Sequence, residues 1–476
     1  MKHPLSSLLA RASRKRAMSA GICLAMLLGG SAVMAQSSFT SLDSTPEGQI
    51  SFAAATRGQP ILAGSEVLVS GQGFEAGQQI TLLHGDTPLQ DRSLVAAADG
   101  SISASIIIPA DAVIGTHPIV VVAQNPYHAA IAQLKVSPTI PLFGQEDYEV
   151  VHARASRGLY QSAYSTKHNT VFVASAVGRP PVSQSELVKL DADTLEILTR
   201  ANPKEVEASA SGQGPVSLYA VYGVGLDDTA DTVWVTNTRQ NTIAVYQQSD
   251  LSLIKQFAAN SVQHPRDVLV DSIAGKAFVS ATGMPEVVVV DTSTLEIAEV
   301  IEISSLQRRQ SFSAASMSLD AEGHRLYVVS LSTSEVAIIN TLTNEVEKVL
   351  AVPGARGTIG VSHDAETGRI FVAAQGTDNL VILDAETGSV LADTPIGAGA
   401  LNVVFDPVQR RAYVSNRGAG SIAITDEDGM IIANLGPAPS ANHVSLGKDG
   451  TIFAVDKSAG ATGEENDSIL RIRPRR

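Results

Sequence analysis

The sequence contains almost no cysteine. Among its 476 residues only Cys23 carries a thiol, and it lies in an apolar N-terminal stretch. The residue before it is Ile22 rather than a small residue, so we do not expect lipid attachment at Cys23. The chain beyond this stretch can form no disulfide and offers neither a thiolate nucleophile nor a cysteine-based metal site. Its stability must therefore come from the size of its core.

Catalytic motifs are equally scarce. The sequence has no G-x-S-x-G, so a nucleophile elbow is unsupported, and its scattered histidines form no H-x-H or H-x-x-x-H pair. Two acidic loops, at residues 426–429 and 227–231, have a superficial likeness to calcium sites. The first lacks the remaining acidic positions of a calcium loop, and we predict a turn there and a solvated loop at the second. We therefore predict no catalytic residue, no metal and no cofactor.

Positive charge is the minority charge. The sequence has 34 Lys and Arg against 48 Asp and Glu, for a formal net charge of −14. Such a surface repels polyanions at long range. Because the Debye length is only about 8 Å at physiological salt, a local basic patch could still bind an anion. The global charge lowers the expectation of nucleic-acid binding without excluding it.

The N-terminus has the pattern of an export signal. Five basic residues precede an apolar run at residues 17–28, and Val33, Met34 and Ala35 form a small-residue cleavage site. The run is shorter than the roughly 20 residues that a spanning helix needs. We predict that residues 1–35 are a cleaved signal peptide, that no transmembrane anchor remains after cleavage, and that the protein is periplasmic or secreted.

A small all-β domain is expected at residues 49–137. Its predicted strands are residues 50–54, 66–70, 79–84, 93–97, 101–108, 118–123 and 129–136, with turn residues between them. This pattern is typical of an immunoglobulin-like β-sandwich, although the Cys…Trp…Cys core of true immunoglobulin domains is absent. Pro138 and Pro141 make residues 138–147 a stiff linker.

Repeated three-stranded units dominate the remainder. Residues 368–396 show one unit, with strands predicted at residues 370–374, 379–384 and 389–392. One antiparallel unit of this kind cannot bury its apolar faces alone, so it requires similar neighbours. An aromatic residue in each second strand aligns seven units: Phe172, Trp234, Phe278, Tyr327, Phe371, Tyr413 and Phe453. Most spacings approach the roughly 40–45 residues of a four-stranded propeller blade, and a polar insertion at residues 204–214 lengthens the first.

The chain ends supply a closing strand. The last unit stops at its third strand, residues 468–473, whereas residues 148–153 are strand-like and otherwise unpaired. Pairing them completes the seventh blade and leaves no open edge. The predicted fold is therefore all-β, an immunoglobulin-like β-sandwich followed by a seven-bladed β-propeller at residues 148–473, closed by its N-terminal strand.

Several short segments carry a family resemblance. VWVTN at residues 233–237 and AYVSN at residues 412–416 resemble the YVTN signature of bacterial forty-residue β-propeller repeats. The order of further segments along the chain resembles that of the YncE-type periplasmic seven-bladed propellers. These segments are SRGLYQSAYS, HPRDVLVD, GHRLYVVS, RRAYVSN and DSILRIR. The resemblance covers residues 148–473. It implies an exported, soluble propeller without established enzymatic chemistry, and single-stranded nucleic acid is one ligand type suggested for such proteins. The added sandwich departs from this pattern.

The candidate site follows from propeller geometry. Loops that enter the first strands and loops that join second to third strands share one face around the axis. The predicted ligand-facing residues are Arg157, Tyr160, Tyr219, Tyr222, Asn237, Arg239, His264, Arg266, Phe312, Arg356, Asn402, Asn416, Arg417, Asn442, His443 and Lys457. Such side chains suit a polar ligand or a stacked base. In the alternative interpretation, the aromatic rings fill the channel and the arginines pair with carboxylates.

Three functions are compatible with this pattern. We favour an exported, non-enzymatic binding or scaffold protein that presents one axial face to an unknown protein or small-molecule ligand. One alternative is single-stranded nucleic-acid binding through the Arg and Tyr cluster, which predicts strong salt dependence. The other is a lactonase-like, metal-dependent hydrolase, which would need acidic residues at the channel mouth, where few are predicted.

Overall fold

The computed structural model describes residues 48–206 and 217–475. The predicted signal peptide and most of the predicted insertion lie outside these residues. The described chain is all-β apart from the short helix α1 (Ala459–Thr462) and three single-turn 3-10 segments, η1 (Gln145–Asp147), η2 (Thr238–Gln240) and η3 (Lys448–Gly450). No helix among the described residues has the length and apolar character needed to cross a membrane.

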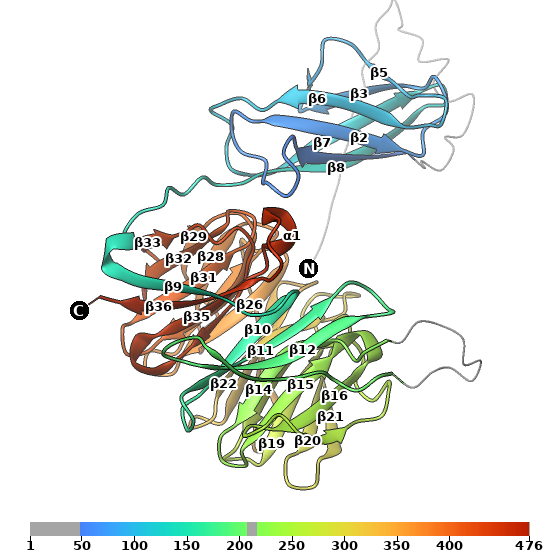
Figure 1. Cartoon of the computed structure of the whole chain (residues 1–476). Helices are drawn as coiled ribbons and strands as arrows, with labels where there is room; N and C mark the ends of the chain where they lie inside the picture. The colour runs from blue at the N-terminus through green and yellow to red at the C-terminus, as the bar shows by residue number, and fades with distance from the viewer. Residues whose placement is uncertain (1–47, 207–216, 476) are drawn as a thin grey trace, which may run out of the picture. The chain divides into compact units, whose positions relative to one another are not determined.

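The first eight strands form two sheets, drawn in blue in Figure 1. Their bounds are β1 (Gln49–Ala54), β2 (Glu66–Gln72), β3 (Gln79–His84), β4 (Thr87–Pro88), β5 (Leu94–Val95), β6 (Ile102–Ile107), β7 (Gly115–Gln124) and β8 (His128–Val136). One sheet has the order β1-β2-β6, and the other has β4-β3-β7-β8 with β5 paired to β3. Alternate residues of β2 are buried, as a strand with one face on a core requires. All seven strands predicted for this region overlap observed strands.

The remaining strands form four-stranded antiparallel sheets (Figure 1), of which the described residues contain seven. The first four sheets are β10 (Leu159–Ser165), β11 (Thr170–Val177), β12 (Gln184–Asp191) and β13 (Ile197–Ala201); β14 (Val221–Asp227), β15 (Thr232–Asn237), β16 (Thr242–Gln247) and β17 (Leu253–Gln256); β18 (Pro265–Asp271), β19 (Lys276–Ala281), β20 (Glu286–Asp291) and β21 (Glu296–Glu302); β22 (Ala314–Asp320), β23 (Arg325–Ser330), β24 (Glu335–Asn340) and β25 (Val346–Ala351).

The last three sheets continue the series. They are β26 (Thr358–Asp364), β27 (Arg369–Ala374), β28 (Asn379–Asp384) and β29 (Val390–Pro395); β30 (Ala400–Asp406), β31 (Arg411–Asn416), β32 (Ser421–Asp426) and β33 (Ile431–Leu435); β34 (Ala441–Leu446), β35 (Ile452–Asp456) and β36 (Ser468–Pro474), completed by β9 (Tyr148–Arg154). In this last sheet β9 pairs antiparallel with β36, from Tyr148 opposite Pro474 to Arg154 opposite Ser468. The predicted pairing of residues 148–153 with residues 468–473 is therefore present.

The sheets follow one another around an axis. The first strand of each sheet packs against the first strand of the next, and β34 packs against β10, so the series of contacts closes. This arrangement is consistent with a β-propeller. The second strands are buried on both faces, because neighbouring sheets cover them, and their aromatic residues anchor the packing. Phe172, Trp234 and Tyr413, for example, are each 1% exposed or less.

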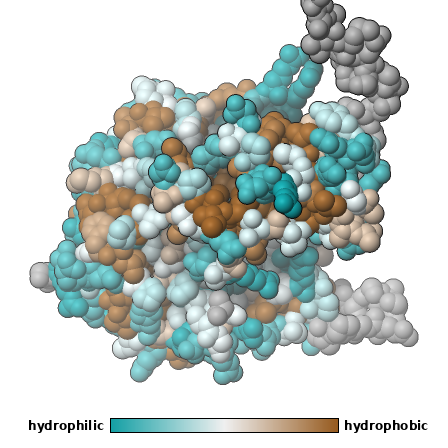
Figure 2. Space-filling model, turned by 90° about the horizontal axis from the view of Figure 1, so that it is seen from above, coloured by the Kyte–Doolittle hydropathy of each residue, from teal (hydrophilic) through white to brown (hydrophobic). Residues whose placement is uncertain are grey.

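Burial is greatest in the second and third strands of the sheets, and most outer strands are more exposed. In the third sheet β19 and β20 are almost entirely buried, whereas six of the seven residues of the outer strand β21 are exposed. The outer strands face solvent with apolar as well as polar residues, and Leu198, Val300 and Leu391 are among the exposed ones. On the face drawn in Figure 2, hydrophobic residues form separate patches among hydrophilic ones rather than one continuous surface.

Candidate functional site

A β-bulge recurs in the first strand of every four-stranded sheet. The register with the second strand shifts between Leu159 and Ser162 in β10, and it shifts at the equivalent point in the other six first strands. A bulge adds a residue that has no ladder partner and re-aims the side chains around it. Two rings of residues result. The outer ring is Tyr160, Tyr222, Arg266, Ala315, Ile359, Leu401 and Asn442, and the inner ring is Gln161, Gly223, Asp267, Ser316, Gly360, Asn402 and His443.

A cavity of about 270 Å³ lies at the outer ring. We call it the axial cavity. Its lining is Tyr160, Gln161, Tyr222, Thr238, Arg239, His264, Arg266, Thr282, Ile359, Gln375, Leu401, Arg417, Asn442 and His443. Eight of the sixteen residues predicted to face a ligand are in this lining, and they come from positions 160 to 443 of the chain. Closure of the sheets thus brings half of the predicted set together.

The lining is rich in cations and contains no carboxylate. Arg239 lies in η2, Arg266 in β18, and Arg417 directly after β31. Within the described residues, none of these three guanidiniums has a carboxylate within ion-pair distance. The alternative in which these arginines form structural ion pairs is therefore not what the described structure shows. Such a site attracts anions even though the chain as a whole is acidic.

Two tyrosine rings contact the cationic side chains of Arg239 and Lys457. The rings of Tyr160 and Tyr222 meet edge to face, with centroids 4.2 Å apart. Arg239 donates a hydrogen bond from Nε to the Tyr222 hydroxyl at 3.2 Å, and its guanidinium lies 5.7 Å from the Tyr222 ring centroid. Lys457 follows β35 and places Nζ 3.4 Å from the Tyr160 ring centroid. Ring faces are negative and hold cations without neutralising them.

The inner ring closes the floor of the axial cavity with hydrogen bonds between sheets. Gln161 donates from Nε2 to Asp267 Oδ1 at 2.6 Å, and the Met317 amide donates to Asp267 Oδ2 at 3.0 Å. On the other side of the ring, the Val444 amide donates to Asn402 Oδ1 at 2.9 Å. These amides lie next to the bulges, so side chains from neighbouring sheets satisfy groups that the ladder leaves unpaired.

Two inner-ring positions are glycine because the neighbouring strand approaches too closely for a side chain. A Cβ on Gly223 would lie 2.2 Å from the carbonyl oxygen of Arg266, and one on Gly360 would lie 2.7 Å from Cα of Asn402. Both obstacles are backbone atoms. The first strands therefore meet at the axis through backbone contact at these two points.

Burial shifts the protonation equilibria around the floor. It raises the pKa of Asp267, against the attraction of Arg266, and it lowers the pKa of Arg266, against the attraction of Asp267. Burial, reinforced by repulsion from Arg266, lowers the pKa of His443 to about 3. The imidazole is therefore neutral at physiological pH. Its Nδ1 accepts a hydrogen bond from the Ser162 amide at 3.3 Å.

Three predicted site residues are in the core instead. Phe312, Asn237 and Asn416 are each 0% exposed and do not line the axial cavity. Phe312 packs in the cluster between the third and fourth sheets. Asn416 donates from Nδ2 to the Ile396 carbonyl at 2.8 Å, and Asn237 accepts from Gln256 at 3.3 Å. The asparagines that end the VWVTN and AYVSN segments therefore support loops.

Other predicted residues lie nearby without lining the axial cavity. Tyr219 is 8% exposed, and Asn402 is occupied in the floor. Arg157 lines a separate polar cavity of about 470 Å³, and Arg356 is exposed. Conversely, the prediction missed Gln161, Thr238, Thr282, Ile359, Gln375 and Leu401 of the lining. The bulge, which no sequence motif marks, decides the orientation of three of these, Gln161, Ile359 and Leu401.

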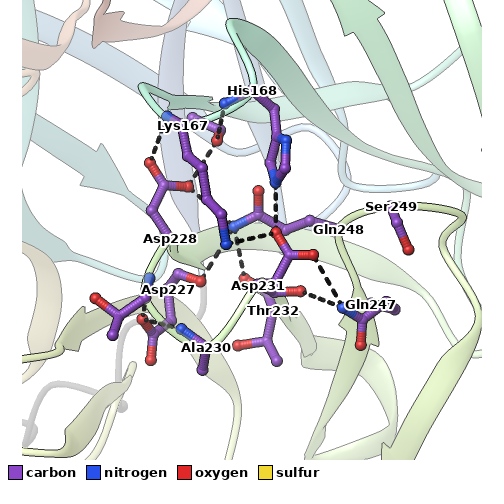
Figure 3. A network of polar contacts seen from close by, with 12 residues as sticks. Lys167, His168, Asp227, Asp228, Ala230, Asp231, Thr232, Gln247, Gln248 and Ser249 are labelled. Atoms are coloured by element: carbon purple, nitrogen blue, oxygen red, sulfur yellow. Dashed lines mark hydrogen bonds and ion pairs between the residues drawn. The ribbon is translucent and has the colours of Figure 1, made fainter.

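The acidic loop at residues 227–231 joins the first two sheets through hydrogen bonds and ion pairs (Figure 3). Asp228 accepts hydrogen bonds from Ser165 Oγ at 2.6 Å, from the Lys167 amide at 3.2 Å and from Gln248 Nε2 at 3.0 Å. Asp231 contacts the His168 imidazole and pairs with the Lys167 ammonium at 3.3 Å. These carboxylates are occupied by protein donors rather than open for a cation.

Replacing Asp228 by alanine is expected to lower the free energy of unfolding by about 2 kcal/mol, because amide and hydroxyl donors of the first sheet lose their acceptor. Burial would raise the Asp228 pKa, but hydrogen bonds from Ser165 and Gln248 leave it below its ordinary value. The stabilisation is then present above the unfolded-state pKa of roughly 3.9 and is lost as pH falls further. Urea denaturation from pH 7 to pH 3 should show this, with the exposed turn residue Asp250→Ala as control. Equal effects of the two substitutions would contradict a stabilising role of Asp228 between the first two sheets.

The loop at residues 426–429 is a turn, as predicted. Asp426 Oδ1 accepts hydrogen bonds from the Asp428 amide at 3.1 Å and from the Met430 amide at 2.8 Å. In the part of the chain that the structure describes, no three His, Cys, Asp or Glu side chains are grouped so as to hold a metal ion.

Comparison with known proteins agrees with this fold. No protein-family model matches the chain. The chain is 23% identical to the uncharacterized protein YncE of Salmonella typhimurium over 359 residues, which cover 72% of this chain and 95% of that protein. It is 23% identical to YncE of Escherichia coli strain K12 over 341 residues, which cover 68% and 90% of the two chains. The chain is thus YncE-like over most of its length.

Solved structures show the same architecture. Hydrazine synthase of Kuenenia stuttgartiensis superimposes with a TM-score of 0.55 at 14% identity, covering 68% of this chain and 98% of that one. Virginiamycin B lyase of Staphylococcus aureus, solved with quinupristin, gives 0.51 at 12% identity, covering 68% and 99%. At these identities the likeness extends to the β-propeller-like fold alone.

Proposed function

We propose that this chain is an exported, non-enzymatic binding protein that holds an anionic ligand in the axial cavity. The carrying observation is the lining itself, which places Arg239, Arg266 and Arg417 together without a carboxylate in a chain of net charge −14. Like charges held together cost free energy in the empty protein, and an anion relieves that repulsion. The favourable free energy of anion binding then offsets the repulsion among the three arginines.

The proposed ligand group is a carboxylate or a phosphate on a small molecule. A volume of about 270 Å³ is slightly below the roughly 300–1,000 Å³ of drug-sized pockets. Guanidinium groups form two parallel hydrogen bonds with either anion. Ile359 and Leu401 provide an apolar side of the cavity, while Thr238 and Asn442 add uncharged polar groups. A compact ligand with one anionic end fits this division.

The wider architecture belongs to the same proposal. We interpret the repeated sheets as a seven-bladed propeller closed by β9, and strands β1–β8 as an immunoglobulin-like sandwich that serves as a spacer or second contact. The signal pattern at residues 1–35 supports a periplasmic or secreted location. Support for the YVTN-type, YncE-like assignment comes from the repeat spacing and the similarity to YncE.

Titration calorimetry with oxalate, a small dianion, tests the proposal. Arg239→Gln and Arg417→Gln should each weaken binding about tenfold, since one charge-assisted hydrogen bond contributes about 1.5–3 kcal/mol. Arg308→Gln is the matched control, because Arg308 is an exposed residue of the loop that enters β22 and does not line the axial cavity. Absence of oxalate binding, or equal weakening by all three substitutions, would refute the anion site.

Single-stranded nucleic acid remains the second candidate ligand. The specific observation in its favour is the Tyr160 and Tyr222 ring pair beside three arginines, since bases stack on aromatic rings and phosphates bind guanidiniums. In the same series, anisotropy of a labelled oligonucleotide should fall steeply with salt and be lost in Arg266→Ala and Arg417→Ala. Binding that is absent or insensitive to salt would exclude it. The lactonase-like alternative gains no support from a lining without carboxylates.

A further inference from the structure

Lys457 is not one of the residues that line the axial cavity, but its amine lies directly beside the cavity, against Tyr160. Its backbone amide donates to the Ser440 carbonyl at 3.0 Å, which fixes the residue at the end of β35. Its Nζ lies on the face of Tyr160, a residue of the cavity lining, and within the described residues no carboxylate forms an ion pair with it. A ring face attracts an ammonium but carries no formal negative charge, so it does not replace a carboxylate partner.

The carboxylate that acts electrostatically on Lys457, Asp467, already accepts hydrogen bonds from backbone amides. Asp467 accepts hydrogen bonds from the amides of Gly158 at 2.7 Å, Leu159 at 3.1 Å and Ala459 at 2.8 Å. Burial lowers the pKa of Lys457 to about 7, repulsion from Arg417 and Arg239 adds to this, and Asp467 opposes it only in part. At neutral pH about half of such lysines therefore carry a free electron pair, as nucleophilic lysines do.

We propose that Lys457 captures small anionic carbonyl compounds, such as 2-oxo acids and aldehydic acids, as an imine. This inference rests on the proposed function, because the arginines of the axial cavity would bind the carboxylate and so place the carbonyl carbon near the amine. The Nζ electron pair forms a bond to the carbonyl carbon, giving a carbinolamine. Both amine protons and the carbonyl oxygen then leave as one water molecule, and no oxidant or reductant is required.

The cationic surroundings suit this step. Burial, and after it repulsion from Arg417 and Arg239, disfavours a further positive charge on Lys457 and so favours its neutral amine in the free protein. The same arginines select carbonyl compounds that carry a negative charge. Capture is reversible because water can hydrolyse the imine again. The cavity would thus retain its ligand covalently without turning it over.

Reductive trapping with glyoxylate, an aldehyde that carries a carboxylate, tests the proposal. The full chain is incubated with glyoxylate and cyanoborohydride at pH 7, and the modified lysines are mapped by mass spectrometry. We expect modification of Lys457 at least tenfold faster than that of Lys448, the exposed lysine in the β34–β35 turn of the same sheet. Lys457→Arg removes the amine and should abolish the preferred adduct, whereas Lys448→Arg should leave it unchanged.

The pH profile separates a special amine from an accessible one. Modification of Lys457 should rise through about pH 7, with Arg239 of η2, Arg417 after β31, Tyr160 of β10 and Asp467 before β36 as the groups that face it. Modification of an ordinary exposed lysine rises only near pH 10.4, roughly the pKa of a free lysine side chain. Oxalate should compete, and acetaldehyde, which lacks the carboxylate, should show no preference for Lys457.

Two outcomes distinguish imine formation at Lys457 from anion binding by the arginines. If oxalate binds with the expected arginine dependence but glyoxylate modifies lysines evenly, the imine is refuted and the anion site stands. If Lys457 is modified preferentially but oxalate neither binds nor competes, the guiding role of the arginines is refuted, and the proposed function fails with it.

Discussion

Replacing Gly223 by alanine is expected to cost about 3 kcal/mol or more of the free energy of unfolding. The added Cβ would lie 2.2 Å from the Arg266 carbonyl oxygen and 2.7 Å from Oγ1 of Thr236. The carbonyl belongs to the first strand of the next sheet, so it can move only if the two sheets separate. Overpacking at this point therefore disturbs the whole ring rather than one side chain.

Gly460→Ala is the matched control for this substitution. Nothing lies within 4 Å of a Cβ at Gly460, which is in α1, and alanine favours helix more than glycine does. We expect no loss of stability there. Urea denaturation of both variants measures the difference through the transition midpoint at constant slope. A Gly223→Ala protein as stable as the control would show that the first strands are not in backbone contact at the axis.

Replacing Asp267 by asparagine should destabilise the protein by about 3 kcal/mol and at the same time strengthen anion binding severalfold. The carboxylate accepts from both Gln161 and Met317, whereas a carboxamide has one acceptor oxygen and would turn an NH₂ group toward a donor. Arg266 also loses its nearest opposing charge. The positive potential of the axial cavity then rises.

Thermal or urea denaturation combined with oxalate calorimetry measures both effects. Asp250→Asn changes an exposed turn carboxylate that does not line the axial cavity and accepts a hydrogen bond from the nearby Ser252 amide, so it should leave oxalate binding unchanged and affect stability much less. A variant that is destabilised but binds oxalate no better would show that Asp267 is only structural. Unchanged stability would mean that the inner ring does not hold the sheets together.

The architecture was predictable because its signals are local and repeated. An aromatic residue in each second strand is buried between sheets in every repeat, so spacing alone locates the sheets. The closing strand β9 was inferred from an unpaired edge. Such features depend on alternation and turn residues that each segment carries in its own sequence.

The candidate site was only half predictable. The residue that faces the axis depends on a bulge, and the sequence around Gln161 or Asp267 does not distinguish a bulged strand from a regular one. The carbonyl that occupies Asn416 comes from another segment, so its structural role is invisible in the AYVSN motif. Phe312 shows the same limit, because only the packing of adjacent sheets decides whether a ring near the axis is core or surface.

The pairing of β9 with β36 also sets the order in which the protein can be completed. Glu149 and Arg471, which form an ion pair at 3.1 Å in this last sheet, are 322 residues apart. Among the four-stranded sheets, β9 must wait for β36 to be synthesised, whereas each of the other six forms from four consecutive strands. Contacts of such long sequence separation are the slow ones in folding. The last sheet therefore forms only after β36 has been synthesised, and the axial cavity acquires its final shape only then.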